Sequence, residues 1–479
     1  MPPSFHRLTP AGLGAVLLVW LVGNLSWLRH DLLLRDGDEE GHVGAAELLR
    51  LHLDGGHWLR FVSDAWRGDL GEYPPLYPAI VAAGWWLVGG GQPGDPSVRG
   101  INLLGHLLAG VCVALLARHL SRPPHRDLST MLGLGLTLCL PLATGLSRHY
   151  MPEGLLVGAV ALSVLLASLA ADRKSPALAG ALGISLGLGL LIKQTFLPLA
   201  VFPVLVAGWR MGRLWWVAAL PAALVCGPWL LGHLNEQAGY VGSSVQSGHT
   251  ASTAAHLLYY PALFPHLLAG PVLALAGLAG GIVLARRDRR ALWTGLAWAI
   301  GIVLFMAIPK KYPRLVAAIS PSLVLLAAVG LPRLPRGPLI SVGVLCLSAG
   351  WVVRGSLVAP DSPSWLPVVD EKCPQHWLRP PSPDALGLPE LAAEVRSSSA
   401  HTLRILDPPE LPCSLQTTHP WHQHVEPYLR REALEVQLSD SDQAELTISF
   451  HAPAAALPGD TALPTLGLVM RMSRRPGAW

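Results

Sequence analysis

Long apolar runs fill the first 360 residues of the chain and almost vanish after them. A helix needs roughly 17 to 25 residues to cross about 30 Å of hydrocarbon. Charged residues make up 14% of the chain, against roughly 25% in soluble proteins. The pattern predicts an all-α polytopic membrane bundle, not a soluble enzyme, a disordered protein or a nucleic-acid binder. About eleven runs are candidate spans, near residues 8–28, 100–118, 130–147, 154–171, 176–192, 195–209, 214–232, 262–285, 291–308, 315–331 and 338–358.

The apolar stretch Leu76–Gly90 decides the topology, because counting it as a crossing would reverse the side on which every later loop lies. It has about fifteen residues, follows Tyr73-Pro74-Pro75, and carries Pro78 and a Trp-Trp pair. A short helix with interfacial aromatic residues is typical of a segment that lies on the membrane. We therefore expect a juxtamembrane helix here, within a first outer loop at 29–97.

The distribution of basic residues tests this choice, since cytoplasmic loops carry an excess of Lys and Arg. With Leu76–Gly90 at the interface, thirteen basic residues face the cytoplasm: Arg118, Arg122, Arg126, Arg173, Lys174, Arg210, Arg213, Arg286, Arg287, Arg289, Arg290, Arg333 and Arg336. The opposite short loops hold five: Arg148, Lys193, Lys310, Lys311 and Arg314. The amino terminus is thus predicted to be cytoplasmic, and the first outer loop and the C-terminal tail extracytoplasmic (periplasmic in a bacterium). The net charge of +4 is too small to indicate a polyanionic partner.

The tail is a different kind of sequence and predicts a small α/β domain. We divide the chain into a membrane module at 1–358, a Pro-rich linker at 359–389 and a soluble domain at 390–479. Cys373 and Cys413 are the two cysteines of the tail, and in an oxidising exterior they form either a disulfide or two buried free thiols. The predicted elements are helices near Leu388–Arg396 and Pro427–Leu434 and strands near Thr402–Leu406, Leu446–Phe450 and Leu466–Met472.

Acidic residues gather at the start of the first outer loop, where Asp36, Asp38, Glu39 and Glu40 fall within five positions. Such a cluster is often only a solvated face. Carboxylates this close repel one another, which raises their pKa values unless a cation, a metal or a substrate relieves the repulsion. The cluster is therefore also a candidate site at the outer membrane surface.

Other charged residues also fall at predicted outer span ends. Glu153 could be an acid that complements a helix N-terminus, or a site residue. Lys193, Lys310 and Lys311 oppose the positive-inside tendency, and they either snorkel to lipid phosphates or bind a phosphate-bearing substrate. Arg314 could add a bidentate phosphate contact.

Three segments of the chain together resemble a known family. Residues 38–49 (Asp-Glu-Glu-Gly-His-Val-Gly-Ala-Ala-Glu-Leu-Leu), 73–78 (Tyr-Pro-Pro-Leu-Tyr-Pro) and 147–153 (Ser-Arg-His-Tyr-Met-Pro-Glu) are similar to motifs of polyprenyl-phosphate-sugar glycosyltransferases of the C superfamily. This family includes protein O-mannosyltransferases and aminoarabinose transferases. Weaker matches lie at 191–195 and 309–314, so the resemblance covers roughly residues 10–335. The chain departs from the family pattern at Tyr73 (usually His), His42 (often Tyr) and Glu153 (usually Asp).

The resemblance implies that a sugar moves, with inversion, from a polyprenyl-phosphate donor to a glycan, lipid or protein acceptor. A phosphate monoester has a second pKa near 6, so the leaving group needs no general acid. The enzyme supplies a carboxylate base and cations that stabilise the departing phosphate. We assign Asp38 or Glu39 as the base and Glu153 to position the sugar or the acceptor. The residues assigned to the donor phosphate are Lys193, Lys310, Lys311, Arg314 and Tyr73.

The implied chemistry requires no cofactor, although a divalent metal between Asp38 and the phosphate is compatible with it. His419, His422 and His424 lack a nearby acid or cysteine and are a weak metal signal. One alternative function is a lipid or solute transporter or flippase, which predicts paired charges near the midplane and internal repeats. A second is a non-catalytic assembly protein whose tail binds a partner while the bundle anchors it.

Overall fold

The structure is a computed structural model of the full chain, and it divides into two compact units. The membrane unit comprises Met1–Leu25 and Ala45–Pro380, and the tail unit comprises Ser26–Gly44 and Pro381–Trp479. The residues described here are 5–31, 37–67, 73–89, 99–246, 253–307, 312–358, 388–398, 402–406, 437–438, 444, 446–451, 457, 461–463 and 468–474.

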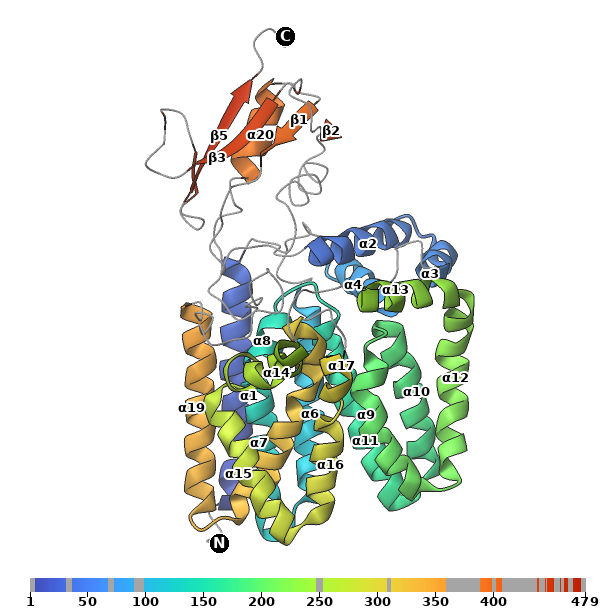
Figure 1. The fold of residues 1–479 in the computed structure, drawn as a ribbon, viewed down its shortest axis with the longest axis vertical. Coiled ribbons are helices and arrows are strands. Elements are labelled where there is room, and N and C mark those ends of the chain that lie inside the picture. The colour runs from blue at the N-terminus through green and yellow to red at the C-terminus, as the bar shows by residue number, and fades with distance from the viewer. Residues whose placement is uncertain are drawn as a thin grey trace. The chain divides into compact units, whose positions relative to one another are not determined.

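Helices make up the membrane unit (Figure 1). α3 and α13 lie across one end of the bundle, while α6, α9 and α10 run along it. The helices are α1 (Phe5–His30), α2 (Gly37–Asp54), α3 (Trp58–Arg67), α4 (Leu76–Leu87), α6 (Ile101–Leu120), α7 (Arg126–Leu138), α8 (Pro141–Leu146), α9 (Glu153–Arg173), α10 (Pro176–Ile192), α11 (Phe196–Met211), α12 (Leu214–Gly232), α13 (Leu234–Gln246), α14 (Thr253–Leu263), α15 (Pro271–Arg287), α16 (Arg289–Ala299), α17 (Ile302–Ala307), α18 (Pro321–Gly330) and α19 (Gly337–Leu357). Short helical turns are η1 (Pro123–His125), η2 (Phe264–Leu268), η3 (Pro313–Ile319) and η4 (Leu331–Arg333).

Every predicted apolar run coincides with helix. Within the described part of the chain, seven helices are long and apolar enough to cross a membrane, and a bent pair, Leu257–Leu268 with Pro271–Arg287, would make eight. α10 and α11 are shorter apolar helices. α4 has 12 residues and so spans about 18 Å, less than the thickness of the hydrocarbon core. The predicted all-α polytopic bundle is confirmed. A straight α4 is too short to cross the hydrocarbon core of a membrane.

Several predicted runs are not continuous helices. The run at 130–147 is divided into α7 and α8, and Pro141, which has no N–H group, starts the second helix. The run at 291–308 is divided into α16 and α17 near Gly301. The run at 262–285 contains a 112° bend, where Gly270 has φ +77°, a conformation that favours glycine. Sequence periodicity misses such breaks because the flanking residues are apolar on both sides.

Glycines let α6 and α9 approach each other closely. A Cβ atom added to Gly105 would overlap the carbonyl oxygen of Gly154, and one added to Gly158 would overlap the carbonyl oxygen of Gly105. Small residues at a helix interface allow backbones to touch in this way. Because α9 starts at Glu153, this contact fixes the position of a predicted site residue relative to α6.

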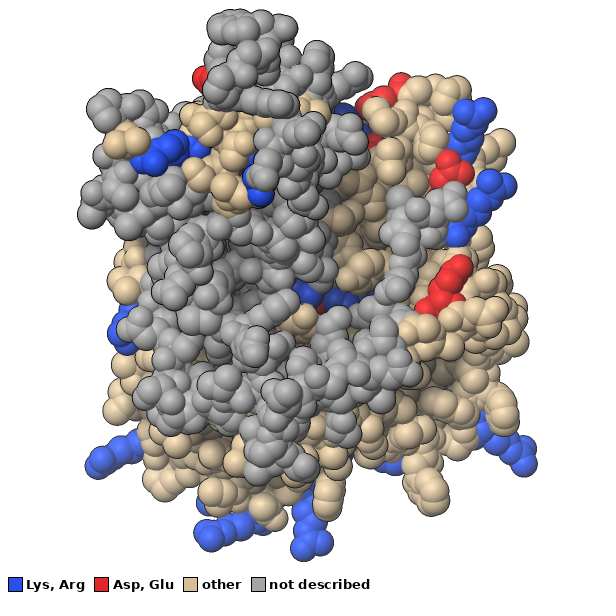
Figure 2. All heavy atoms as spheres, turned by 45° about the horizontal axis from the view of Figure 1, so that its top comes forward, with Lys and Arg blue, Asp and Glu red and all other residues tan. Residues whose placement is uncertain are grey.

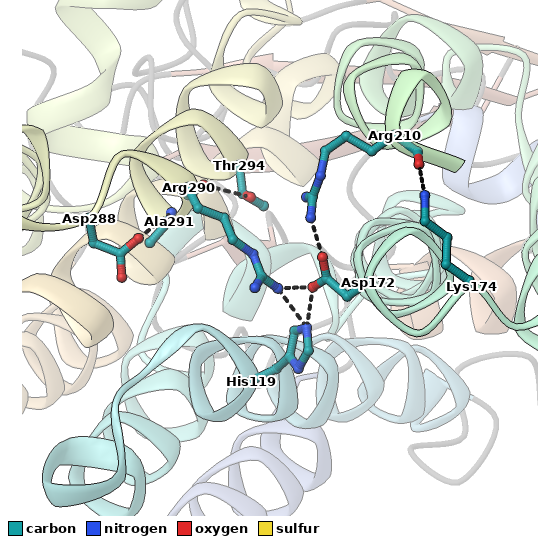
Figure 3. Close-up of polar contacts among 8 residues, drawn as sticks. All are labelled: His119, Asp172, Lys174, Arg210, Asp288, Arg290, Ala291 and Thr294. Carbon is teal, nitrogen blue, oxygen red and sulfur yellow. Dashed lines mark hydrogen bonds and ion pairs between the residues drawn. The ribbon is translucent and has the colours of Figure 1, made fainter. Parts of the chain in front are cut away.

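A second set of charges lies at the opposite end of α9, where Asp172 joins four helices (Figure 3). The Asp172 carboxylate lies 2.6 Å from Nε2 of His119 on α6 and pairs with Arg210 of α11 and Arg290 of α16. Lys and Arg side chains project from the lower edge of the molecule (Figure 2). This inner cluster (His119, Asp172, Arg210 and Arg290) was not predicted, although Arg210 and Arg290 were assigned to one face of the membrane.

The tail unit contains a five-stranded sheet in the order β2-β1-β3-β5-β4. β1 pairs in parallel with β2 and β3, whereas β5 pairs antiparallel with β3 and β4. Buried side chains of α20 (Leu388–Ser398) and of β1 and β3 form its core. The predicted helix at 388–396 and three strands are confirmed, while β2 and β4 are too short to predict. The strands are β1 (Thr402–Ile405), β2 (Gln437–Leu438), β3 (Leu446–His451), β4 (Thr461–Leu463) and β5 (Leu468–Arg474).

Other tail predictions lie outside the described residues: helix Pro427–Leu434, Cys373, Cys413 and nearly all of the linker 359–389.

Candidate active site

Glu153 and Lys193 form a buried ion pair. Glu153 is the first residue of α9, and Lys193 directly follows α10, with its backbone N–H bonded to the carbonyl of Gly189. The Lys193 Nζ lies 2.6 Å from the Glu153 Oε1, and the two side chains are only 5% and 1% exposed. A pair this well buried is costly to desolvate and is retained only when its geometry is good.

Arg314 approaches the same carboxylate oxygen from a third segment. Pro313 begins the turn η3, and the next residue, Arg314, is buried with its Nε 3.8 Å from the Glu153 Oε1. Its guanidinium also lies 4.9 Å from the ring centre of Tyr312. Two cations therefore face one carboxylate, and these three side chains carry a net positive charge.

The second carboxylate oxygen of Glu153, Oε2, differs from Oε1 in its hydrogen bonding. Oε2 is buried, and no hydrogen-bond donor among the described residues reaches it. A buried polar atom without a partner is costly. The arrangement leaves Oε2 as an acceptor for a donor group such as a hydroxyl.

Tyr73 borders the site on another side. The Lys193 Nζ lies 5.9 Å from the centre of the Tyr73 ring, close to the outer limit for a cation–π contact. Tyr73 precedes Pro74 and Pro75, which lead into α4. The structure thus brings together four predicted site residues from four separate segments: Tyr73, Glu153, Lys193 and Arg314.

The structure does not place the remaining predicted site residues relative to this group. Asp38 and Glu39 lie in the first turn of α2, in the tail unit, and the Glu39 side chain is fully buried. The side chain of Asp38 and the whole of Lys310 and Lys311 lie outside the described residues.

Sequence reasoning missed Asn102, which is fully buried at the start of α6. Its Nδ2 atom donates to the hydroxyl of Tyr77 at 3.0 Å and to the carbonyl of His149. Polar residues are rare in membrane spans. The position of Asn102 inside an apolar run was therefore the one sequence signal that could have identified it.

Arg148 anchors the loop before Glu153. Its Nε donates to Oδ1 of Asn24 on α1 at 2.8 Å, and its Nη1 donates to Oγ of Ser356 on α19 at 2.9 Å. The loop is therefore attached to two helices that are distant in sequence. Figure 2 shows Lys or Arg atoms near the middle of one face of the molecule.

Metal ligands do not gather in the described residues, where no group of three or more His, Cys, Asp or Glu side chains could hold an ion. The tail histidines His419, His422 and His424 lie outside those residues. The described site offers cations and one carboxylate instead, a set suited to an anion.

The described helices define a class: a multi-pass membrane protein whose fold is shared with solved membrane proteins. No protein-family model and no curated protein matches the chain. The chain is similar in structure to ArnT from Cupriavidus metallidurans in its apo state, with a TM-score of 0.60, 16% identity and 94% of each chain covered.

Two further solved structures share this fold. ArnT of the same organism bound to undecaprenyl phosphate gives a TM-score of 0.56 at 16% identity, covering 95% of this chain and 94% of the other. The apo oligosaccharyltransferase of Archaeoglobus fulgidus gives a TM-score of 0.50 at 13% identity, covering 91% of this chain and 65% of the other. At these identities the likeness establishes the fold.

Proposed function

We propose that the chain is a membrane glycosyltransferase that moves a sugar from a polyprenyl-phosphate donor to an acceptor on the extracytoplasmic face. The observation that carries this proposal is the buried carboxylate of Glu153 between Lys193 and Arg314. The shared fold with ArnT, one structure of which holds undecaprenyl phosphate, supports the choice of donor.

The two buried cations account for the phosphate group. Lys193 supplies a compact charge and Arg314 a planar fork that matches phosphate oxygens. In a low-dielectric site such charges stabilise the negative charge that develops on the leaving phosphate. Lys310 and Lys311 are close to Arg314 in sequence and complete the proposed phosphate site, and Tyr73 shields Lys193 from one side.

Glu153 has two roles in this proposal, one for each oxygen. Oε1 holds Lys193 and Arg314 in place through charge. Oε2 accepts a hydrogen bond from a hydroxyl of the sugar or of the acceptor, which is consistent with its lack of a partner among the described residues. Because Lys193 neutralises this carboxylate, Glu153 is a poor general base, and the base is assigned to another residue.

That base is Asp38 or Glu39. One of these carboxylates removes the proton from the acceptor hydroxyl as the oxygen attacks the anomeric carbon. The bond to the phosphate breaks on the opposite face, so the configuration inverts and the phosphate leaves on the polyprenyl lipid. The phosphate is already a good leaving group, so we propose that no cofactor is required. A divalent metal at Asp38 remains compatible with the same displacement.

The remaining parts of the proposal concern orientation and acceptor. From the excess of Lys and Arg on one side we propose that the amino terminus is cytoplasmic and the tail unit extracytoplasmic, which means periplasmic in a bacterium. The acceptor is a glycan, a lipid or a protein. The proposed reaction involves no nucleic acid.

Transfer from a labelled donor tests the proposal directly. Purified protein in detergent is incubated with radiolabelled polyprenyl-phosphate sugars and a membrane extract that supplies acceptors. We expect labelled product from the wild type, a loss of at least a hundredfold in Glu153→Gln, and near-normal transfer in Asp127→Asn. Asp127 is a suitable control because it forms a partly exposed surface pair with Arg118, and such pairs contribute little. Movement of labelled lipid across vesicles without any product would favour the transporter alternative.

A further inference from the structure

A single amide group connects two segments of the proposed site. Asn102 is fully buried in the first turn of α6. Its Nδ2 atom donates to the Tyr77 hydroxyl at 3.0 Å and to the His149 carbonyl. An amide NH₂ carries two hydrogens, so each of these bonds uses one of them.

The two bonded segments carry the two neighbours of Lys193. Tyr77 lies in the first turn of α4, four positions after Tyr73. His149 lies four positions before Glu153, in the loop that leads into α9. Lys193 contacts both Glu153 and Tyr73, and both of these residues therefore depend on segments tethered to Asn102.

Packing adds a third contact. A Cβ atom added to Gly154 would lie 2.8 Å from Cβ and 3.0 Å from Cγ of Asn102. Position 154 thus lacks room for a side chain because Asn102 occupies it. Since Gly154 directly follows Glu153, the side chain of Asn102 rests against the residue next to the proposed site carboxylate.

We infer that Asn102 is a positioning residue, which sets the Glu153 carboxylate and the Tyr73 ring around Lys193; this inference rests on the proposed function. An asparagine is costly in an apolar span, and a leucine would satisfy the packing. Its donor bonds explain its presence, because they fix the loop before Glu153 and the start of α4 to one atom. A displacement of about 1 Å in a catalytic group can reduce the rate by roughly a hundredfold.

The central test is a double-mutant cycle of two substitutions. Asn102→Leu keeps the volume but removes the donor, and it is made both in the wild type and in Glu153→Gln. If Asn102 acts through Glu153, Asn102→Leu lowers turnover by at least tenfold in the wild type and by less than twofold in Glu153→Gln. A merely structural role would give the same loss in both backgrounds and would overturn the inference, as would full turnover in Asn102→Leu.

Ser163→Ala is the matched control. Ser163 also lies on α9, and its hydroxyl pairs with Ser185 of α10 at 2.8 Å, away from the loop. Its loss removes one buried contact between helices without reaching Glu153. We expect turnover within twofold of the wild type, with melting temperatures of Ser163→Ala and Asn102→Leu close to each other. Tyr77→Phe removes one of the two acceptors and is expected to show part of the loss seen in Asn102→Leu.

Hydrogen exchange separates this inference from the proposed function, because it needs no substrate. Exchange of residues 147–154 is measured by mass spectrometry on the same proteins. It should be faster in Asn102→Leu and unchanged in Ser163→Ala. Equal exchange in all three proteins would overturn the tether at Asn102. Faster exchange in Asn102→Leu together with a wild type that transfers no sugar would contradict the proposed function and leave the tether supported.

Discussion

The Nζ of Lys193 lies 2.6 Å from Oε1 of Glu153, and neither side chain is more than 5% exposed. Forty residues separate them in the sequence, and a second buried cation, Arg314, approaches the same oxygen. This site holds two cations and one anion. Stability alone explains it poorly, because a buried ion pair rarely makes a fold more stable than apolar side chains at the same positions would.

Glu153→Gln should reduce thermal stability as well as transfer. Removing one member of a buried pair leaves an uncompensated charge, which costs about 3 to 5 kcal/mol. Adding Lys193→Met should restore most of the melting temperature but none of the transfer activity. Melting is followed by intrinsic fluorescence in detergent. A double variant that melts below Glu153→Gln would contradict this account of the pair.

Arg314→Lys should weaken binding of undecaprenyl phosphate about tenfold, because lysine keeps the charge but loses the planar fork. Tenfold corresponds to about 1.4 kcal/mol. Binding of the lipid to purified protein can be measured by native mass spectrometry. Arg118→Ala is the control, since this exposed arginine pairs with Asp127 on the surface. Equal affinities in wild type and Arg314→Lys would remove Arg314 from the phosphate site.

Asp172→Asn should lower stability by about 2 kcal/mol without changing turnover of the folded protein. The carboxylate of Asp172 holds His119, Arg210 and Arg290 in the inner cluster, and hydrogen bonds to charged groups contribute roughly 1.5 to 3 kcal/mol. Melting temperature and transfer per folded molecule are the two measurements. A selective loss of turnover at unchanged stability would mean that this cluster belongs to the reaction.

The attachment of α3 to the end of α12 should weaken as pH rises. Nε2 of His233 lies 2.7 Å from the carbonyl oxygen of Arg67 and Nδ1 lies 2.9 Å from that of Trp229, so both ring nitrogens act as donors only in the protonated form. Partial burial lowers the pKa of His233, but these two carbonyls and the Glu236 carboxylate outweigh it and raise the pKa above its ordinary value.

The direction of this pH effect follows from the raised pKa. The stabilisation is complete below the unfolded pKa of about 6.5 and is lost as pH rises through the higher folded value. Hydrogen exchange of residues 58–67, corrected for intrinsic rates, should therefore accelerate between pH 6 and pH 9 in the wild type. His233→Gln should show no such step. A step of equal size in His233→Gln would assign the effect to another group.

Three of the predicted site residues could be picked out of the sequence because they depart from the tendencies around them. Lys193 and Arg314 are basic residues at predicted outer span ends, and Glu153 is an acid beside an apolar run. Their meeting at one carboxylate could not be predicted, because Glu153 and Arg314 lie 161 positions apart and only helix packing brings them together. Asn102 left only a weak signal in the sequence, because one uncharged amide barely alters the hydropathy of a span.

The fold was predictable where length and periodicity determine it. Each apolar run coincides with helix, and α4 is as short as its prolines and tryptophans indicated. The interruptions near Pro141, Gly270 and Gly301 were not predicted, because a break inside an apolar segment leaves the average hydropathy unchanged. The inner cluster was missed for another reason: an excess of Lys and Arg indicates a side of the membrane, not the partners of each residue.

α9 is constrained at both of its ends, by Glu153 at the first residue and by Asp172 near the last. Each residue of an α-helix adds about 1.5 Å of length and 100° of rotation. Inserting or deleting one residue between these two acids would turn one of them away from its partners, whatever residue was chosen. The number of residues in α9 is therefore constrained by these two contacts, and homologous chains should keep this length while varying in the apolar side chains outside the glycine contact with α6.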